Sequence, residues 1–302
     1  MKEIRNFLNF VEISTKLASV IPFSVGVGYT LYRFGSVKPW QTLVFFTAML
    51  LFDMTTTAIN NHIGNRQTGR KPHYLTEVSI ALIFVMGLTA VGLGIYLAWM
   101  SGIVILFAGI FCFGIGVVYS YGPLPIARTP FGELFSTVMG FFVPFIALQI
   151  SHPIISVAFD NTGEVVIAAN VWEILSLGVV VMPLVCCIAN IMLANNICDM
   201  DEDVEVKRYT FPFFIGIKRS LRLYALLYVA AFAFIGIGAA FGIIPIYSVA
   251  TALIGAWFVR KNIRLFFELQ DKRQTFFTVI LNFLFICVPY SAWFWIGTLL
   301  AI

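Results

Sequence analysis

Long apolar runs divide this chain and constrain its fold more than any other feature of the sequence. As helices, most of them would cross a hydrocarbon layer about 30 Å thick. With 60% hydrophobic and 11% charged residues, the chain does not have the composition of a soluble protein. We therefore predict an all-α, polytopic membrane protein, with one domain over residues 1–302 and nine transmembrane helices. The runs lie at residues 8–32, 40–60, 75–100, 103–120, 133–150, 174–198, 222–241, 244–259 and 276–300.

Lysine and arginine are distributed unequally between the loops that alternate along these helices. Because cytoplasmic loops collect positive charge, the distribution indicates an orientation. One set of loops holds only Arg33 and Lys38, whereas the other set holds sixteen of the 19 basic residues, beginning with Lys2 and Arg5. The sequence thus predicts a multi-pass protein of the cell membrane. Its amino terminus and the loops with candidate functional residues are cytoplasmic, and its carboxyl terminus is outside. The net charge of +4 follows from this topology and indicates no nucleic-acid partner.

Two predicted cytoplasmic loops resemble each other. The loop after the second run reads TTTAINNHIGNRQTGRKPHY, and the loop after the sixth reads LANNICDMDEDVEVKRYTFPFFIG. In each, an apolar helix ends in a double asparagine, and polar residues and then a basic stretch follow. Their separation by four runs indicates a weak internal repeat.

The second of these loops holds the densest cluster of acids. As a continuation of the sixth helix, Asn195, Asp199 and Asp203 recur every fourth residue, and Asn196 projects on the same face. Like charges at this spacing repel, so a positive group should compensate. One interpretation is a solvated acidic loop, with its counter-charge nearby in the chain. The other is a Mg²⁺ site, since Mg²⁺ takes one or two carboxylates and completes its shell with water and phosphate.

The counter-charges expected for this cluster follow it directly. Lys207 and Arg208 are the first basic residues after the acids. Beside a cation held by Asp199 and Asp203, they would help to hold a diphosphate. The acidic loop thus predicts either a solvated ion-pair cluster or a phosphate site.

The second run carries its own polar stripe. Asp53 lies deep in the run, where an unpaired charge would be costly, so it marks either a functional site or a hydrogen bond between helices. Asn60 or Asn61 follows on the same stripe, which Asn65 continues if the helix extends, and His62 and Asn65 are candidate contacts for metal or phosphate. Lys16 in the first run either reaches the membrane interface or points into the bundle as an anion contact.

The segment YSYGPLPIARTPFGELF joins the fourth and fifth runs on the same predicted side. Its Gly and Pro residues predict a turn, and Glu133 lies in the first turn of the next helix. An acid is favoured there by the helix dipole alone, so Glu133 is either a helix-start residue or a substrate contact. Tyr119, before the turn, offers an aromatic face to a cation.

These motifs together resemble the UbiA superfamily of intramembrane prenyltransferases. The resemblance extends over about residues 12–216 and is greatest to the 1,4-dihydroxy-2-naphthoate prenyltransferases of menaquinone synthesis, whose second motif reads Asn-Asn-x-x-Asp-x-x-x-Asp. This sequence departs from the family's first motif, Asn-Asp-x-x-Asp-x-x-x-Gly or -Asp. Laid on Asn61, it places His62 and Asn65 where acids are expected and Gly69 at its last position.

The resemblance implies a site and a reaction. In a UbiA-like bundle with a lateral cavity open to lipid, Mg²⁺ at Asp199 and Asp203 would neutralise the diphosphate of a polyprenyl substrate. The resemblance further implies that Asn195, Asn196, Lys207 and Arg208 assist, and that an aromatic acid accepts the prenyl group. For 1,4-dihydroxy-2-naphthoate, the acceptor would lose its carboxylate as CO₂.

Two alternatives compete with this interpretation. The departures at His62 and Asn65 favour a relative with another acceptor or no turnover. A secondary transporter would also have polar breaks in paired halves, but it should place them near the membrane midplane. Most polar residues here cluster at one end of the predicted helices, with only Asp53 deeper.

Overall fold

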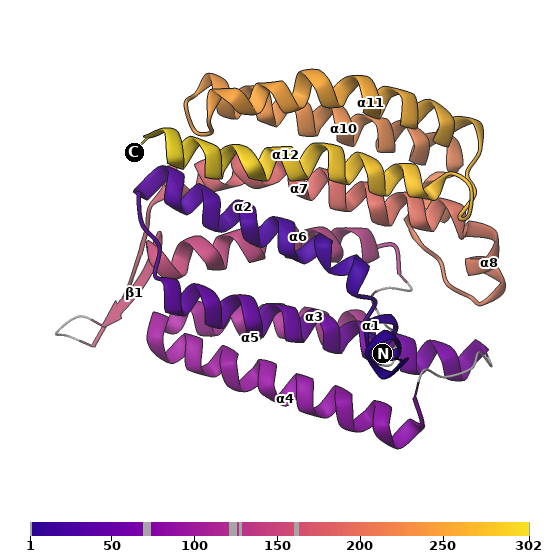
Figure 1. Ribbon diagram of the computed structural model, residues 1–302, viewed down its shortest axis with the longest axis horizontal. Helices are drawn as coiled ribbons and strands as arrows, with labels where there is room; N and C mark the ends of the chain where they lie inside the picture. Colours follow the sequence, from indigo (N-terminus) through magenta and orange to yellow (C-terminus); the bar gives the residue numbers. More distant parts are fainter. Residues whose placement is uncertain (1, 69–73, 121–125, 127–128, 160–162, 302) are drawn as a thin grey trace.

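The structure is a computed structural model that describes residues 2–68, 74–120, 126, 129–159 and 163–301. It is a bundle of long helices that run side by side, with one small β-hairpin (Figure 1). In chain order the elements are α1 (Lys2–Phe10), η1 (Ile13–Lys16), α2 (Leu17–Phe34), α3 (Pro39–Thr68), α4 (Thr76–Ser101), α5 (Ile103–Ser120), α6 (Gly132–Ser151), β1 (Ile155–Phe159), β2 (Val165–Ala169), α7 (Val171–Cys198), α8 (Met200–Glu205), α9 (Phe211–Ile215), α10 (Ile217–Ala240), η3 (Ile246–Ser248), α11 (Val249–Glu268) and α12 (Phe276–Ala301).

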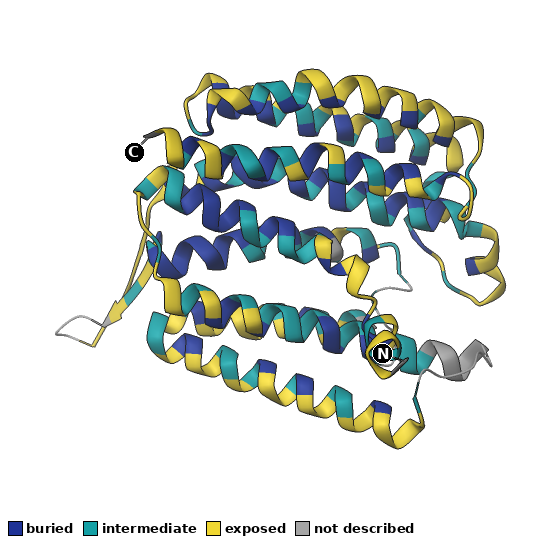
Figure 2. Cartoon of the chain, viewed as in Figure 1, coloured by how far each residue is buried: buried dark blue, intermediate teal, exposed yellow. Residues whose placement is uncertain are grey.

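Helix α7 lies at the centre of the bundle. It packs against α6, α10 and α12, while α3 pairs with α4 on one side and α11 packs against α12 on the other. Buried residues follow α7 and the sides of its neighbours that face it (Figure 2). Helix α7, which leads into the acidic loop, is therefore held in place by several other helices.

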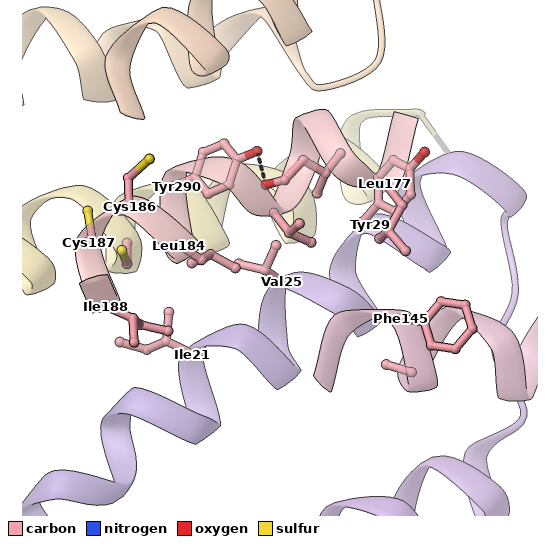
Figure 3. Close-up of a cluster of buried hydrophobic side chains, with 14 of the residues drawn as sticks. Ile21, Val25, Tyr29, Phe145, Leu177, Leu184, Cys186, Cys187, Ile188 and Tyr290 are labelled. Carbon is pink, nitrogen blue, oxygen red and sulfur yellow. Dashed lines mark hydrogen bonds between the residues drawn. The ribbon is translucent and has the colours of Figure 1, made fainter. Parts of the chain in front are cut away.

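The central core is apolar and closely packed. Ile21 and Val25 of α2 lie opposite Leu184 and Ile188 of α7 (Figure 3). The Tyr290 hydroxyl drawn there is satisfied, since it donates a 2.9 Å hydrogen bond to the carbonyl oxygen of Val180. A buried hydroxyl without such a partner would destabilise the fold.

The outer faces of the bundle are also apolar. On α4 the most exposed side chains are large and hydrophobic, as expected for a helix that faces lipid. They include Phe84, Val85, Leu88, Ile95 and Trp99.

The membrane-spanning prediction is confirmed in its coarser form. Within the described residues, six helices are long and apolar enough to cross a membrane, or seven if α1 and η1–α2, bent by 50°, form one broken span. Helix α5 is a shorter apolar helix, and α11 carries Arg260, Lys261 and Arg264 within its length. The count of nine spans therefore stays a prediction.

The all-α prediction missed a hairpin between α6 and α7. Strands β1 and β2 pair antiparallel, with Ile155 opposite Ala169 and Phe159 opposite Val165. Gln149 anchors the first strand, because its side chain accepts from Ile154 N at 2.9 Å and donates to Ile155 O. The β-branched residues of these short strands favour an extended backbone.

The two asparagine-rich segments lie at the same end of the bundle. Figure 1 shows the carboxyl-terminal ends of α3 and α7 there, together with α1 and the start of α12, whereas β1 and the carboxyl terminus lie at the other end. We call the end with the carboxyl-terminal ends of α3 and α7 the polar end. Glu12, with φ of 48°, separates α1 from η1, so the chain bends as it enters the bundle.

Candidate functional site

The acidic segment continues the backbone hydrogen bonding of α7 across its end. Asp199 N donates to Asn195 O at 3.0 Å, and Asp203 N donates to Asp199 O at 2.8 Å. These are helical i to i+4 bonds, although Asp199 itself caps both α7 and α8. Asn195, Asp199 and Asp203 therefore succeed one another along one side of the chain, as their spacing predicts.

Asp199 finds its counter-charge far away in the sequence. Lys272, in the loop between α11 and α12, donates to Asp199 Oδ2 and, at 2.5 Å, to Asn195 Oδ1. Asn195 Nδ2 also donates to Asp199 Oδ2 at 3.2 Å. Lys272 was not predicted as a site residue, because in the sequence it is only one of several basic residues in that loop.

Lys207 does not compensate these acids in the structure. Its side chain is exposed, its φ is 56°, and it forms no ion pair among the residues described. The positive charge that contacts Asp199 thus comes from Lys272 in another loop, and not from Lys207.

Arg208, in contrast, lies where it was expected. Its Nη1 is 3.4 Å from Asp203 Oδ1, and its Nη2 donates to Asn196 Oδ1 at 3.3 Å. The amide of Asn196 in turn donates to Glu133 Oε1 at 2.7 Å. Arg208, Asn196 and Glu133 therefore form a chain of contacts between the acidic segment and the start of α6.

The Asp203 carboxyl group is the most enclosed of the acids in this segment. The residue is 6% exposed, and its Oδ2 has no hydrogen-bond partner in the described part of the chain. Burial raises the pKa of Asp203 above its usual value, and the positive charge of Arg208 opposes this rise. A buried carboxylate oxygen of this kind is a suitable ligand for a cation.

Glu133 and Tyr119 lie near this network. Glu133 is in the first turn of α6, as its helix-start interpretation predicts, but its side chain also reaches Asn196. Tyr119 is half-buried near the end of α5, within electrostatic range of Arg208 and Glu133. The two side chains thus belong to the polar end of the bundle.

Lys16 and Asp53 form a separate polar cluster between α2 and α3. The Lys16 ammonium lies 2.6 Å from Asp53 Oδ1 and donates to Thr57 Oγ1 at 2.6 Å, while Ser19 Oγ donates to Asp53 Oδ2 at 2.6 Å. Lys16 is 3% exposed, so it points into the bundle. Lys16 and Asp53, which were interpreted separately from the sequence, in fact pair with each other.

The first asparagine-rich segment is only partly described. Asn61 Nδ2 donates to Phe10 O at 3.0 Å and so links α3 to α1, and His62 is half-buried. The side chain of Asn65 and the whole of Gly69 lie outside the described residues.

The donor set at the acidic segment fits Mg²⁺ within limits. Over the described ranges, no three His, Cys, Asp or Glu residues are grouped closely enough to hold a metal ion by themselves. Mg²⁺ does not need such a group, because it usually takes one or two carboxylates plus water and phosphate oxygens. Asp199 and Asp203 are the two carboxylates that could provide such ligands, and Asp203 Oδ2 has no hydrogen-bond partner among the described residues.

An apolar groove of about 510 Å³ opens between α5 and α6 and is lined by Phe107, Phe111, Phe142 and Phe145, among others. A second groove of about 510 Å³ lies between α10 and α11. Neither groove is lined by the acidic segment. The predicted lateral cavity between that segment and the lipid stays a prediction.

Apolar helices that end in carboxylates, amides and basic groups are typical of an intramembrane enzyme whose substrate has an anionic head and an apolar tail. The sequence model of the UbiA prenyltransferase family matches residues 19–286. This chain belongs to the UbiA prenyltransferase family. The transporter alternative is therefore set aside.

The comparisons with individual proteins agree with this family. A 1,4-dihydroxy-2-naphthoate octaprenyltransferase of Bacillus subtilis (strain 168) is 30% identical over 167 residues, which are 55% of this chain and 47% of the relative. The match thus spans about half the length of that relative.

Solved structures share the fold. A UbiA homologue of Archaeoglobus fulgidus, bound to GPP and Mg²⁺, superposes with a TM-score of 0.67 at 14% identity, over 97% of this chain and 99% of that one. A homologue from Aeropyrum pernix K1 has a TM-score of 0.67 at 19% identity, over 96% and 98% of the two chains.

Proposed function

We propose that this prenyltransferase transfers a polyprenyl group from its diphosphate to 1,4-dihydroxy-2-naphthoate in a Mg²⁺-dependent reaction. The name of the Bacillus subtilis relative supports this acceptor, and the Archaeoglobus fulgidus homologue bound to GPP and Mg²⁺ supports the donor and the cation. We also propose that the polar end faces the cytoplasm of a cell membrane, since sixteen of the 19 basic residues fall in the loops predicted from the sequence for that side.

One observation carries the proposal more than the others. Asn195, Asp199 and Asp203 follow one another at the polar end of an apolar bundle, and Lys272 and Arg208 contact their side chains. A prenyl diphosphate has an anionic head for such a site and an apolar tail for the helices and lipid below it.

The residues of the acidic segment would bind the diphosphate. Asp199 and Asp203 would hold the cation, and Asn195 would orient Asp199. Bound there, Mg²⁺ would stabilise the charge that develops on the leaving oxygen. Lys272 and Arg208 would donate to phosphate oxygens, and Lys207 would approach the same group from solvent.

The Arg208 chain of contacts would keep these donors in position. Asn196 holds the Arg208 guanidinium by one amide atom and Glu133 by the other. Tyr119 would present its ring to the allylic cation, whose charge is attracted to an aromatic face. Exclusion of water at this stage prevents capture of the cation.

The Lys16 and Asp53 cluster would contact the acceptor. The Lys16 ammonium can face the carboxylate of an aromatic acid, and Asp53 can accept a hydrogen bond from a ring hydroxyl. Asn61, His62 and Asn65 would line the first-motif side of the diphosphate site. Because imidazole and amide ligands are neutral, this side should hold a cation more weakly than carboxylates would.

The reaction balances without a redox cofactor. The allylic C–O bond breaks, and diphosphate leaves with the electron pair. An electron-rich ring carbon of the acceptor then forms the new C–C bond to the allylic carbon. For this acceptor the ring carbon carries the carboxylate, which departs as CO₂ and restores the aromatic ring, so demethylmenaquinol and diphosphate are released.

The test is transfer by the purified protein in lipid nanodiscs. The protein would be incubated with Mg²⁺, labelled polyprenyl diphosphate and a panel of aromatic acids. We expect label in the lipid product and CO₂ release with 1,4-dihydroxy-2-naphthoate only. Chelation of Mg²⁺, Asp199→Ala and Asp203→Ala should each abolish both signals. Transfer to a different acid would show that this acid, and not 1,4-dihydroxy-2-naphthoate, is the acceptor.

A second candidate rests on the first motif. His62 and Asn65 stand where the family resemblance places acids, which favours a relative with another acceptor or no turnover. The same panel separates the two, because this candidate requires that no transfer to the naphthoate occurs.

A further inference from the structure

The side chain of Lys272 contacts one of the two carboxylates that are proposed to hold the cation. Its ammonium contacts Asp199 Oδ2 and Asn195 Oδ1, and it lies 5.4 Å from the centroid of the Phe276 ring. The ion pair joins residues 73 positions apart in the chain. The Lys272 side chain is 45% exposed and that of Asp199 is 20% exposed, so the ammonium can exchange this contact for another on its solvent side.

The loop that carries Lys272 is fixed by its own hydrogen bonds. Asp271 Oδ1 accepts from Arg273 N at 2.8 Å and from Gln274 N at 2.7 Å. Thr275 Oγ1 accepts from Asp271 N at 3.0 Å. These bonds hold the backbone on both sides of Lys272, so a change of contact requires only rotation of its long side chain.

Lys272 and a divalent cation cannot share Asp199 Oδ2 at contact distance. Two positive charges that close repel strongly at the low effective dielectric of a partly buried site. A cation that binds Asp199 must therefore displace the ammonium. The displaced ammonium remains tethered within reach of whatever anion accompanies the cation.

We propose that Lys272 is an exchangeable counter-ion that regulates the order of binding at the diphosphate site. It neutralises Asp199 before substrate arrives, which weakens binding of the divalent cation alone. It then contacts a diphosphate oxygen once the cation has taken Asp199. Because coupling between two ligands is reciprocal, the cation and the diphosphate each bind more tightly in the presence of the other. This proposal rests on the proposed function.

The test measures binding, not turnover. Wild-type protein, Lys272→Gln and Lys272→Arg would be titrated in nanodiscs with Mg²⁺ alone and with magnesium pyrophosphate, by calorimetry. Arg273→Gln is the matched control, because it removes an equal charge from the neighbouring position. Thermal unfolding of each variant would verify that it is folded.

The expected changes have opposite signs. Lys272→Gln should bind Mg²⁺ alone about threefold more tightly, because a competing charge has gone, and magnesium pyrophosphate about tenfold more weakly, because a charged donor has gone. Arg273→Gln should change neither affinity by more than about twofold, and Lys272→Arg should retain pyrophosphate binding.

The outcomes distinguish this proposal from the one on which it rests. If the wild-type protein binds both probes but Lys272→Gln loses Mg²⁺ affinity or keeps its pyrophosphate affinity, the exchange is wrong and the prenyltransferase site stands. If the wild-type protein binds neither probe, the diphosphate site itself is wrong, and the exchange fails with it.

Discussion

The ammonium of Lys16, at the end of η1, lies 2.6 Å from Oδ1 of Asp53 on α3. The lysine side chain is 4% exposed and the aspartate side chain 25%. Each charge therefore depends on the other for compensation, and this dependence can be measured.

Removal of either partner should destabilise the bundle more than removal of both. Asp53→Asn leaves a buried ammonium without its counter-charge and should cost about 2 kcal/mol, at the low end for a buried pair because Asp53 is partly exposed. Lys16→Met with Asp53→Asn should recover part of this loss, as a double-mutant cycle would reveal. Thermal unfolding in detergent micelles provides the measurement. Additive losses in the double variant would mean that the pair is not coupled.

The contact between Asn196 and Glu133 gives a prediction about polarity. Asn196→Asp would replace an amide donor by an acceptor 2.7 Å from Glu133 Oε1, so it should lower the transfer rate at least tenfold, a loss of about 1.4 kcal/mol. Adding Glu133→Gln supplies a donor from the other side and should restore much of the rate. Asn60→Asp, at an exposed amide on α3, is the control. No rescue by the double variant would argue against the hydrogen bond.

The pKa of Asp203 predicts how pH acts on cation binding. Because burial raises this pKa, the folded protein holds the proton at a pH where an ordinary aspartate is already ionised. The cost of burying the charged carboxylate is complete above the folded-state pKa and is relieved as pH falls through it. Cation affinity should fall over that same window, since the proton competes for the carboxylate. Binding of Mn²⁺ followed against pH would show this fall. In Asp203→Asn, the part of the pH dependence of Mn²⁺ affinity that comes from the Asp203 carboxyl group should be lost.

The first motif predicts an effect of restored acids. His62→Asp with Asn65→Asp should keep or raise the transfer rate. The double variant should also need less Mg²⁺ to reach half of its maximal transfer rate, because carboxylates bind Mg²⁺ better than neutral ligands. His62→Ala with Asn65→Ala controls for loss of the native side chains. A rise in the Mg²⁺ requirement with the acids would place these residues away from the cation.

Helix packing can be tested at Gly26. A Cβ there would lie 2.6 Å from the Cα of Pro144, so α2 and α6 would have to move apart. Gly26→Val should therefore destabilise the protein by about 2 kcal/mol. Gly92→Val, where a Cβ meets nothing within 4 Å, should leave the melting temperature nearly unchanged. Equal melting temperatures for the two variants would contradict the close approach.

Local patterns in the sequence predicted what neighbouring residues do. The fourfold spacing of Asn195, Asp199 and Asp203 predicted their common side, because helical periodicity is a local property. The apolar runs predicted the helical membrane bundle for the same reason.

Contacts between distant segments could not be predicted in this way. The bond from Asn196 to Glu133 spans 63 positions and the pair of Lys272 with Asp199 spans 73, so no spacing marks them. Lys207 was predicted to contact the acids because it is near them in sequence, whereas in the structure it is exposed after α8 and Lys272 contacts Asp199. The apolar run at 244–259 did not show that α11 continues to Glu268, because the last part of the helix carries basic residues.

The long separation between Lys272 and Asp199 has a consequence for how the protein is made. During synthesis, Asp199 leaves the ribosome 73 residues before the lysine that neutralises it. Throughout that interval the nascent chain must accommodate an uncompensated carboxylate beside the inserting helices. Only the last pair of helices, when it joins the others, delivers the missing charge, so assembly of the polar end is completed late in translation.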